Sequence, residues 1–119
     1  MAMTMGDPSG IGPEIALKAW AQTRDSESAP FFVLADPAHL QRLGRSIGLD
    51  LPIAADEPEN AAAVFAEALP VVPLSAAVSG EPGRPAPADA RLTIEAIERA
   101  VAYVHAGSAS AVVTNPISK

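Results

Sequence analysis

The stretch MGDPSGIGPE, residues Met5–Glu14, decides the fold because it places three glycines and two prolines in ten residues, directly after the apolar opening MAMTM. Glycine allows backbone angles that other residues resist and leaves room for a ligand or a neighbouring strand, whereas proline fixes φ near the helical value. Pro13 suits the first helical position, with Gly12 at or near the cap. The stretch therefore predicts a turn that joins an opening strand to a helix ending near Thr23.

The next segments repeat this alternation of an apolar run and a helix. FFVLA, Phe31–Ala35, is apolar throughout and predicts a buried central strand. Asp36 and Pro37 then predict the cap and first turn of a helix that ends at Gly48.

The middle of the chain carries weaker signals. LPIAA at 51–55 and VVPL at 71–74 are candidate strands, and Asn60–Leu69 between them is an alanine-rich candidate helix. SGEPGRPAPAD at 79–89 is dense in proline and glycine, which predicts a loop, because proline lacks the amide proton that a regular ladder needs.

The clearest helical pattern follows that loop and ends at Gly107. It carries one apolar stripe at helical spacing, made by Ile94, Ile97, Val101 and Val104. SAVVT, Ser110–Thr114, then predicts another buried strand. This alternation predicts an α/β fold with a partial, mainly parallel sheet flanked by helices.

Composition restricts the classes of protein and of site. The chain has 119 residues, 49% of them apolar, which is enough for one modest domain with a buried core. It has no cysteine, which removes disulfides, thiolate nucleophiles and zinc-thiolate sites, and its net charge of −6 argues against broad binding to nucleic acid. No apolar run approaches a membrane span and no secretory signal opens the chain, so we expect a soluble, cytoplasmic protein.

The two histidines do not form a metal-binding pair. We expect His39, early in a helix, to be solvated, and His105 to lie near a helix C-terminus. Neither has a second ligand at the spacing of a metal site, so the residues of this chain predict no metal centre.

Two short motifs, GDPSGIGPE and TNPISK, each follow a predicted strand directly. The first is not a dinucleotide fingerprint, because Ile15 stands where the third glycine belongs, and no Lys-Ser or Lys-Thr makes it a phosphate-binding P-loop. If the two strands are parallel, however, both motifs lie at the same sheet edge, where open α/β sheets bind their ligands.

We therefore predict a substrate cleft lined by residues of both motifs, namely Asp7, Gly10, Gly12, Thr114, Asn115 and Lys119. Short hydroxyl and amide side chains supply hydrogen bonds, and a lysine supplies a point charge suited to phosphate or carboxylate. Two plainer interpretations stay open. The first motif is then only a tight turn, and Thr114, Asn115 or Ser118 caps the next helix.

Several motifs taken in order carry a family resemblance: MTMGDPSGIGPEI, FFVLAD, LPVVPL, the long amphipathic helix and AVVTNPISK. Together they resemble the N-terminal part of the 4-hydroxythreonine-4-phosphate dehydrogenase family, over the whole chain. The GIGPE core is also similar to a turn of the isocitrate and isopropylmalate dehydrogenases. The closing motif is a variant of the family's Thr-x-Pro-Ile-x-Lys, with Asn115 and Ser118 at its variable places.

The resemblance implies an isocitrate/isopropylmalate dehydrogenase-like fold, with residues 1–119 as the N-terminal fragment of a two-domain homodimer. It implies an enzyme of pyridoxal phosphate (vitamin B6) biosynthesis that oxidises 4-phosphohydroxy-L-threonine with NAD and a divalent metal (Zn, Mg or Co), followed by decarboxylation. The metal lowers the alcohol's pKa and NAD accepts the hydride. The family's metal-binding histidines and NAD contacts lie downstream of the closing motif, so we assign no catalytic, metal or NAD residue here and expect the isolated chain to be inactive.

Two other functions stay open. Relatives that share the opening motif act on other phosphorylated hydroxy acids or on a cis-dihydrodiol carboxylate, and the substrate-choosing residues lie outside this chain. Alternatively, the 119 residues are a complete natural product, a non-catalytic ligand-binding or dimer-forming module. In each case the expected partner is a small molecule and not a nucleic acid or a membrane.

Overall fold

The computed structural model describes residues 1–6, 10–24, 30–49, 51–79 and 86–114. Within them five strands form one sheet, in the order β3-β4-β2-β1-β5, and every pair of neighbours is parallel. The strands are Ala2–Thr4 (β1), Phe32–Ala35 (β2), Ile53–Ala55 (β3), Leu69–Pro73 (β4) and Val112–Val113 (β5). The helices are Gly12–Thr23 (α1), Pro37–Ser46 (α2), Ala61–Val64 (α3) and Asp89–Ala106 (α4), with a 3-10 turn η1 at Pro58–Asn60.

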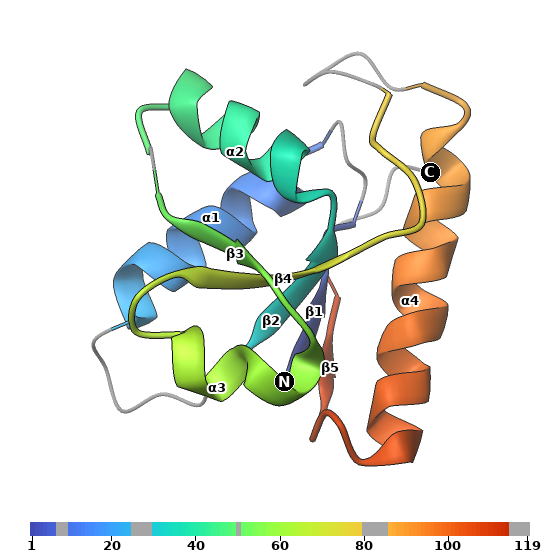
Figure 1. Ribbon diagram of the computed structural model, residues 1–119. Helices are drawn as coiled ribbons and strands as arrows, with labels where there is room; N and C mark the ends of the chain where they lie inside the picture. Colours follow the sequence, from blue (N-terminus) through green and yellow to red (C-terminus); the bar gives the residue numbers. More distant parts are fainter. Residues whose placement is uncertain (7–9, 25–29, 50, 80–85, 115–119) are drawn as a thin grey trace.

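Helices lie on both sides of the sheet (Figure 1). α1 and α2 pack together on one face, and α4 crosses the other face over β1 and β2. The predicted α/β fold with a mainly parallel sheet is confirmed.

The core sits on the central strands and is closed by aromatic side chains. β2 is buried at all its positions, as the apolar run Phe31–Ala35 predicted. Trp20 of α1 is 0% exposed, and its indole Nε1 donates to the carbonyl oxygen of Phe65 at 2.7 Å. The Phe65 ring meets Phe31 edge-on, with 5.0 Å between centroids. The buried indole N–H is thus satisfied, as burial requires.

The start and end of α2 match their sequence signals. The Asp36 carboxylate accepts from the amide of Ala38 at 3.1 Å and so caps the first turn. Near the other end, Gly44 is buried against the carbonyl of Leu49, and a Cβ at Gly44 would collide with that oxygen. The glycine therefore lets the chain fold back over the helix immediately after it ends.

The alanine-rich prediction at 60–69 was too long. Only Ala61–Val64 is α-helical, preceded by η1, and Leu69 already belongs to β4. Phe65 and Leu69 are both buried, and the chain leaves the helix between them so that Leu69 can enter the sheet. Core burial overrides the helix propensity of alanine here.

The prediction of a buried strand at Ser110–Thr114 was wrong in burial and in length. β5 has two residues, with Val112 half-buried and Val113 37% exposed. The physical reason is its place in the sheet, because β5 has β1 as its one neighbour among the described strands. A strand with a neighbour on one side only leaves its outer edge accessible to solvent.

α4 is confirmed as a helix, but its apolar stripe is not the face that it buries. The buried residues on α4 are Asp89, Leu92, Thr93, Ala96 and Ala100. Ile94 is 56% exposed and Val101 43% exposed, beside this face. Small side chains bring α4 close to the sheet, and the large ones flank the contact. Of the helices that the structure describes, none combines the length and apolar character needed to cross a membrane.

Candidate functional site

The two motifs leave the sheet at the same edge, as predicted from parallel strands. Ala2 pairs with Val112 and Met3 with Val113, in parallel. The chain therefore passes from β1 into the first motif and from β5 into the second at the carboxyl ends of adjacent strands. This is the edge where open α/β sheets bind their ligands.

The predicted cleft residues divide between described and undescribed parts of the chain. Gly10 and Thr114 are exposed, whereas Gly12 is buried as the first residue of α1. Asp7, Asn115 and Lys119 lie outside the described residues. The roles of all six residues in a cleft stay predictions.

The turn after β1 is fastened to α4. Gly6 is buried with φ 70°, a left-handed conformation that favours glycine. Its carbonyl oxygen accepts a hydrogen bond from the hydroxyl of Thr93 at 3.2 Å, and that hydroxyl also reaches the carbonyl of Asp89 at 3.3 Å. Sequence reasoning missed Thr93, because no local pattern pairs positions so far apart along the chain.

α1 presents its first turn at this edge. It begins at Gly12, inside the first motif, and no side chain caps it at Ile11. Its first-turn N–H groups carry the positive end of the helix dipole, which favours an anionic group. Pro13 is the second helical residue, one position later than predicted.

Two buried carboxylates organise the segment that leads to α4. Besides capping α2, Asp36 accepts from the amide of Val78 at 2.9 Å. Asp89, in the first turn of α4, accepts from the amide of Ser79 at 2.8 Å. Both side chains are more than nine-tenths buried, so they act as anchors for the backbone at 78–79.

His39 corrects one prediction, because it is buried and not solvated. It is 4% exposed, and neither ring nitrogen has a hydrogen-bond partner in the part of the chain that the structure describes. Burial lowers its pKa, opposed by the charges of Asp36 and Asp89 and assisted by that of Arg42. The missed signal was spacing, because His39 stands four residues before the buried Leu43 and shares its helix face.

The described residues do not fit a metal centre. Within the described ranges, no three His, Asp or Glu side chains gather closely enough to hold an ion. No described residue is assigned to NAD either, so we derive no chemical step through a metal or a cofactor from this part of the chain.

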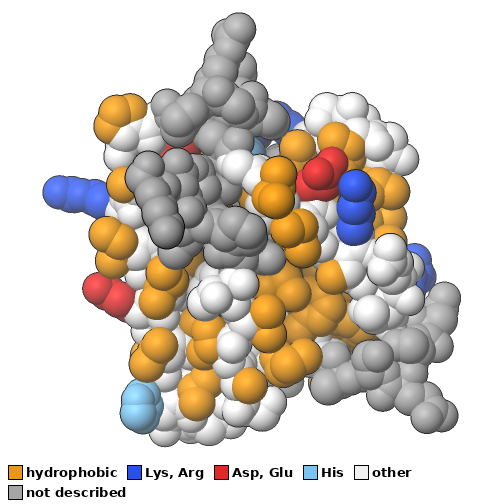
Figure 2. Space-filling model, turned by 180° about the vertical axis from the view of Figure 1, so that it is seen from behind, with side chains coloured by type: hydrophobic (Ala, Val, Ile, Leu, Met, Phe, Trp, Pro, Cys, Tyr) orange, Lys and Arg blue, Asp and Glu red, His pale blue; other side chains and the backbone are white. Residues whose placement is uncertain are grey.

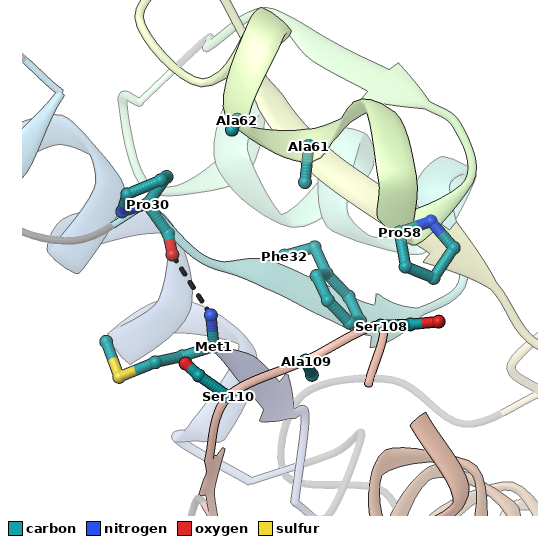
Figure 3. Close-up of a pocket in the computed structure, with 9 residues that line it drawn as sticks. All are labelled: Met1, Pro30, Phe32, Pro58, Ala61, Ala62, Ser108, Ala109 and Ser110. Carbon is teal, nitrogen blue, oxygen red and sulfur yellow. Dashed lines mark hydrogen bonds between the residues drawn. The ribbon is translucent and has the colours of Figure 1, made fainter. Parts of the chain in front are cut away.

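A pocket of about 260 Å³ lies at the opposite end of the sheet (Figure 3). It is lined by Met1, Pro30, Phe32, Pro58, Ala61, Ala62, Ser108, Ala109 and Ser110. Figure 3 shows the Met1 amino group donating to the Pro30 carbonyl, at 3.1 Å, and partial burial lowers the pKa of that amino group. Because the pocket lies where β1 and β2 begin and not where they end, it is separate from the predicted cleft.

Comparison with known proteins gives a consistent result. The family described as pyridoxal phosphate biosynthetic protein PdxA matches residues 27–119. A 4-hydroxythreonine-4-phosphate dehydrogenase of Methylorubrum populi is 50% identical over the whole chain, which covers 35% of that relative. The crystal structure of a 4-hydroxythreonine-4-phosphate dehydrogenase from Klebsiella pneumoniae superimposes with a TM-score of 0.78 at 32% identity, covering 99% of this chain and 37% of that one.

A solved structure with a different named substrate is also similar. The terephthalate 1,2-cis-dihydrodiol dehydrogenase from Burkholderia xenovorans superimposes with a TM-score of 0.68 at 29% identity, over 93% of this chain and 31% of that one. The chain thus spans about a third of the length of the proteins that it matches. The solved relatives place it in the isocitrate dehydrogenase-like fold.

Proposed function

This chain belongs to the PdxA family of pyridoxal phosphate biosynthetic proteins, and we propose that it is the N-terminal third of a 4-hydroxythreonine-4-phosphate dehydrogenase. The observation that carries the proposal is the 50% identity to such a dehydrogenase over the entire chain. The longer protein then oxidises and decarboxylates 4-phosphohydroxy-L-threonine for pyridoxal phosphate synthesis. We assign it to the cytoplasm as a two-domain homodimer.

In this proposal the carboxyl edge of the sheet forms one wall of the substrate cleft. Three features support that role: the convergence of β1 and β5, the exposed Thr114, and the first turn of α1 without a side-chain cap. An uncapped helix start favours the negative charge of a phosphorylated substrate, and a threonine hydroxyl supplies a hydrogen bond. Asp7, Gly10, Gly12, Asn115 and Lys119 complete the proposed wall.

The chemistry of oxidation belongs to the longer protein. In the longer protein a divalent metal would supply polarisation of the substrate alcohol, and NAD would supply the hydride acceptor. The described residues hold neither group in this proposal, and their task is to bind and orient the substrate. We therefore expect the isolated chain to show no dehydrogenase activity.

The test is NADH formation by absorbance, with added divalent metal and 4-phosphohydroxy-L-threonine, for the longer product of the gene and for residues 1–119. The longer protein should reduce NAD and the short chain should not. In the longer protein Thr114→Val should lower kcat/KM about tenfold, since a lost hydrogen bond to a charged group costs on the order of 1.5 kcal/mol. Thr114→Ser, which keeps the hydroxyl, should stay within about threefold of the unchanged protein.

A second substrate class is supported by one observation, the similarity to a terephthalate cis-dihydrodiol dehydrogenase at 29% identity. The same assay with a cis-dihydrodiol carboxylate separates the two. NADH formed from the dihydrodiol and not from the phosphorylated threonine would replace the substrate assignment. Absence of NADH with both substrates would overturn the dehydrogenase proposal and favour a binding module.

A further inference from the structure

The chain leaves the core at Gly6 and returns to it at Gly12. Both glycines are buried, and Gly12 is the first residue of α1. Gly10 and Ile11, which lie between them, are exposed. The exposed pair therefore stands between two buried points. Burial of residues along α1 holds the second point, so the contact that holds Gly6 decides how firmly the exposed pair is placed.

Gly6 is held by α4 and not by the sheet. The last pair in the ladder between β1 and β2 joins Thr4 to Leu34, so Gly6 lies beyond that ladder. Its φ of 70° turns the chain away from the direction of the strand. A buried carbonyl oxygen needs a donor, and at Gly6 the Thr93 hydroxyl donates to it at 3.2 Å. This buried bond ties the end of the strand to the start of α4.

A comparison with Thr23 shows that the Thr93 hydroxyl is shared. A threonine inside a helix often donates its hydroxyl to the carbonyl four residues earlier. Thr23 of α1 does so at 2.7 Å, to Ala19. The Thr93 hydroxyl lies 3.3 Å from the equivalent carbonyl, that of Asp89, and is shared with Gly6. The longer distance fits a hydroxyl that lies between two acceptors.

The start of α4 is a fixed point for this tie. The Asp89 carboxylate accepts from the Ser79 amide at 2.8 Å, which fastens the first turn of the helix to the segment before it. Thr93 lies on the same buried face as Asp89, Ala96 and Ala100. Because α4 also packs against β1, the Thr93 hydroxyl is presented to Gly6 from a rigid element.

The placement of the backbone matters because the described residues of the cleft wall supply no cation. Of the predicted cleft residues, Gly10, Gly12 and Thr114 lie in the described part, and none of the three is charged. Lys18, further along α1, is paired with Glu14 at 3.7 Å. Figure 2, the view from behind, shows Lys and Arg side chains that stand apart from one another. A phosphorylated group at this wall has backbone N–H groups to bind to, and these bind well where the backbone is held in place.

We propose that Thr93 is a positioning residue for the substrate and that it acts through Gly6. Thr93 is 9% exposed, so it lies behind the cleft wall and does not bind the substrate itself. Its bond to Gly6 fixes one end of the exposed span and so places the backbone of Gly10 and Ile11 against the phosphorylated substrate. Small displacements of positioned groups weaken what they bind. The inference rests on the proposed function, which assigns the phosphorylated substrate to this wall.

The kinetic test uses the longer product of the gene and two changes that each replace a threonine hydroxyl by a methyl group. Thr93→Val removes the bond to Gly6, and the control Thr23→Val removes a helical bond on α1. Thr93→Val should raise KM for 4-phosphohydroxy-L-threonine about tenfold and leave kcat within about twofold, because the wall binds the substrate without reacting with it. Thr23→Val should leave both constants within about twofold. Thr93→Ser, which keeps the hydroxyl, should bring KM back to within about threefold of the unchanged protein.

A second measurement, hydrogen exchange followed by peptide mass, needs no substrate. Thr93→Val should speed exchange at least about threefold in the peptide that contains Gly10 and leave the peptide of β2 unchanged, because one anchor of the exposed span is lost. A merely structural role predicts a different pattern, since a smaller folded fraction lowers the apparent kcat and leaves KM unchanged. Thr93→Ala repeats both measurements if Thr93→Val does not fold.

Two results would overturn the positioning role. One is a KM in Thr93→Val equal to that in Thr23→Val, and the other is equal exchange in the two variants at the peptide that contains Gly10. If the unchanged longer protein forms no NADH, the proposed function fails instead. Exchange then decides by itself whether Thr93 holds the turn, so the two failures are told apart.

Discussion

The side chains on the two sides of the buried face of α4, its two flanks, differ in whether they bind other parts of the chain. On one flank Glu95 and Arg99 bind groups beyond the helix: the carboxylate accepts from the Ser75 amide at 3.0 Å, and the guanidinium donates to the Pro73 carbonyl at 2.8 Å. On the other flank Ile94 and Val101 are exposed. The polar flank finds its partners within the described chain, whereas the apolar flank does not.

The pKa of Glu95 reports the hydrogen bonding within the polar flank. Partial burial would raise the pKa of Glu95, but hydrogen bonds from Ser75 and Arg99 outweigh it and lower the pKa. Arg99 also donates to the Tyr103 hydroxyl at 2.7 Å. The network is therefore built to keep this carboxylate charged. The polar flank is thus completed by residues of the described chain.

The largest effect on stability should come from placing a charge on the buried side of α4, in comparison with a charge on its exposed side. Ala100 is 0% exposed, so Ala100→Glu buries an unpaired carboxylate and should lower the free energy of unfolding by more than about 3 kcal/mol. Ala102→Glu, two residues later and exposed, should change it by less than about 0.5 kcal/mol. Urea unfolding followed by circular dichroism measures both. Similar losses for the two variants would contradict the assigned orientation of the helix.

A smaller loss of stability should follow from removing the hydrogen bonds of the polar flank. Arg99→Ala removes three hydrogen bonds, to Pro73, Glu95 and Tyr103, and should cost about 1–2 kcal/mol because the group is partly exposed. The control is Lys18→Ala on α1, which removes an exposed pair with Glu14 at 3.7 Å and should cost less than about 0.5 kcal/mol. Equal urea midpoints for the two variants would mean that the network on α4 adds no stability.

The smallest effect should be a dependence of stability on pH that comes from His39 of α2, which lies within reach of the charge on Asp89 in the first turn of α4. Since burial lowers the pKa of His39 in the folded state, the unfolded chain binds the extra proton first as the pH falls. This contribution to stability is complete above about pH 6.5 and is lost progressively below it. For one proton the slope cannot exceed about 1.4 kcal/mol per pH unit.

Urea unfolding at several pH values tests this term with two variants. His39→Leu should flatten the stability curve between about pH 6.5 and 5. His105→Gln, at an exposed position on α4, is the matched control for replacing a histidine. A curve equally steep in the original chain and in the His39→Leu variant would assign the acid sensitivity to other groups.

The sequence predicts the parts of the fold whose causes are local. The strand at Phe32–Ala35, the cap at Asp36 and the end of α4 at Gly107 follow from short patterns, and all three are confirmed. Whether Ser110–Thr114 is buried could not be predicted from its own residues. Its burial depends on a neighbouring strand on each side, and among the described strands β5 has β1 alone. The helix at Asn60–Leu69 was overestimated for a related reason, since Leu69 is needed in the core.

The same distinction holds for the candidate site. Parallel strands placed both motifs at one edge, which follows from topology alone. The bond from Thr93 to Gly6 joins residues 87 positions apart, and no short pattern reports it. His39 was misjudged because a position early in the helix was expected to face solvent, although Leu40 and Leu43 beside it are core residues.

The order of the strands has a consequence for synthesis on the ribosome. β1 is the first strand to emerge, yet it lies inside the sheet, between β2 and β5. One of its edges finds Phe32 early, but the other waits until Val112 has been translated. Until Val112 has been translated, the nascent chain therefore carries an apolar strand, β1, with one unpaired edge. A strand in that condition is a natural target for chaperones that bind apolar segments, and the last strand releases it.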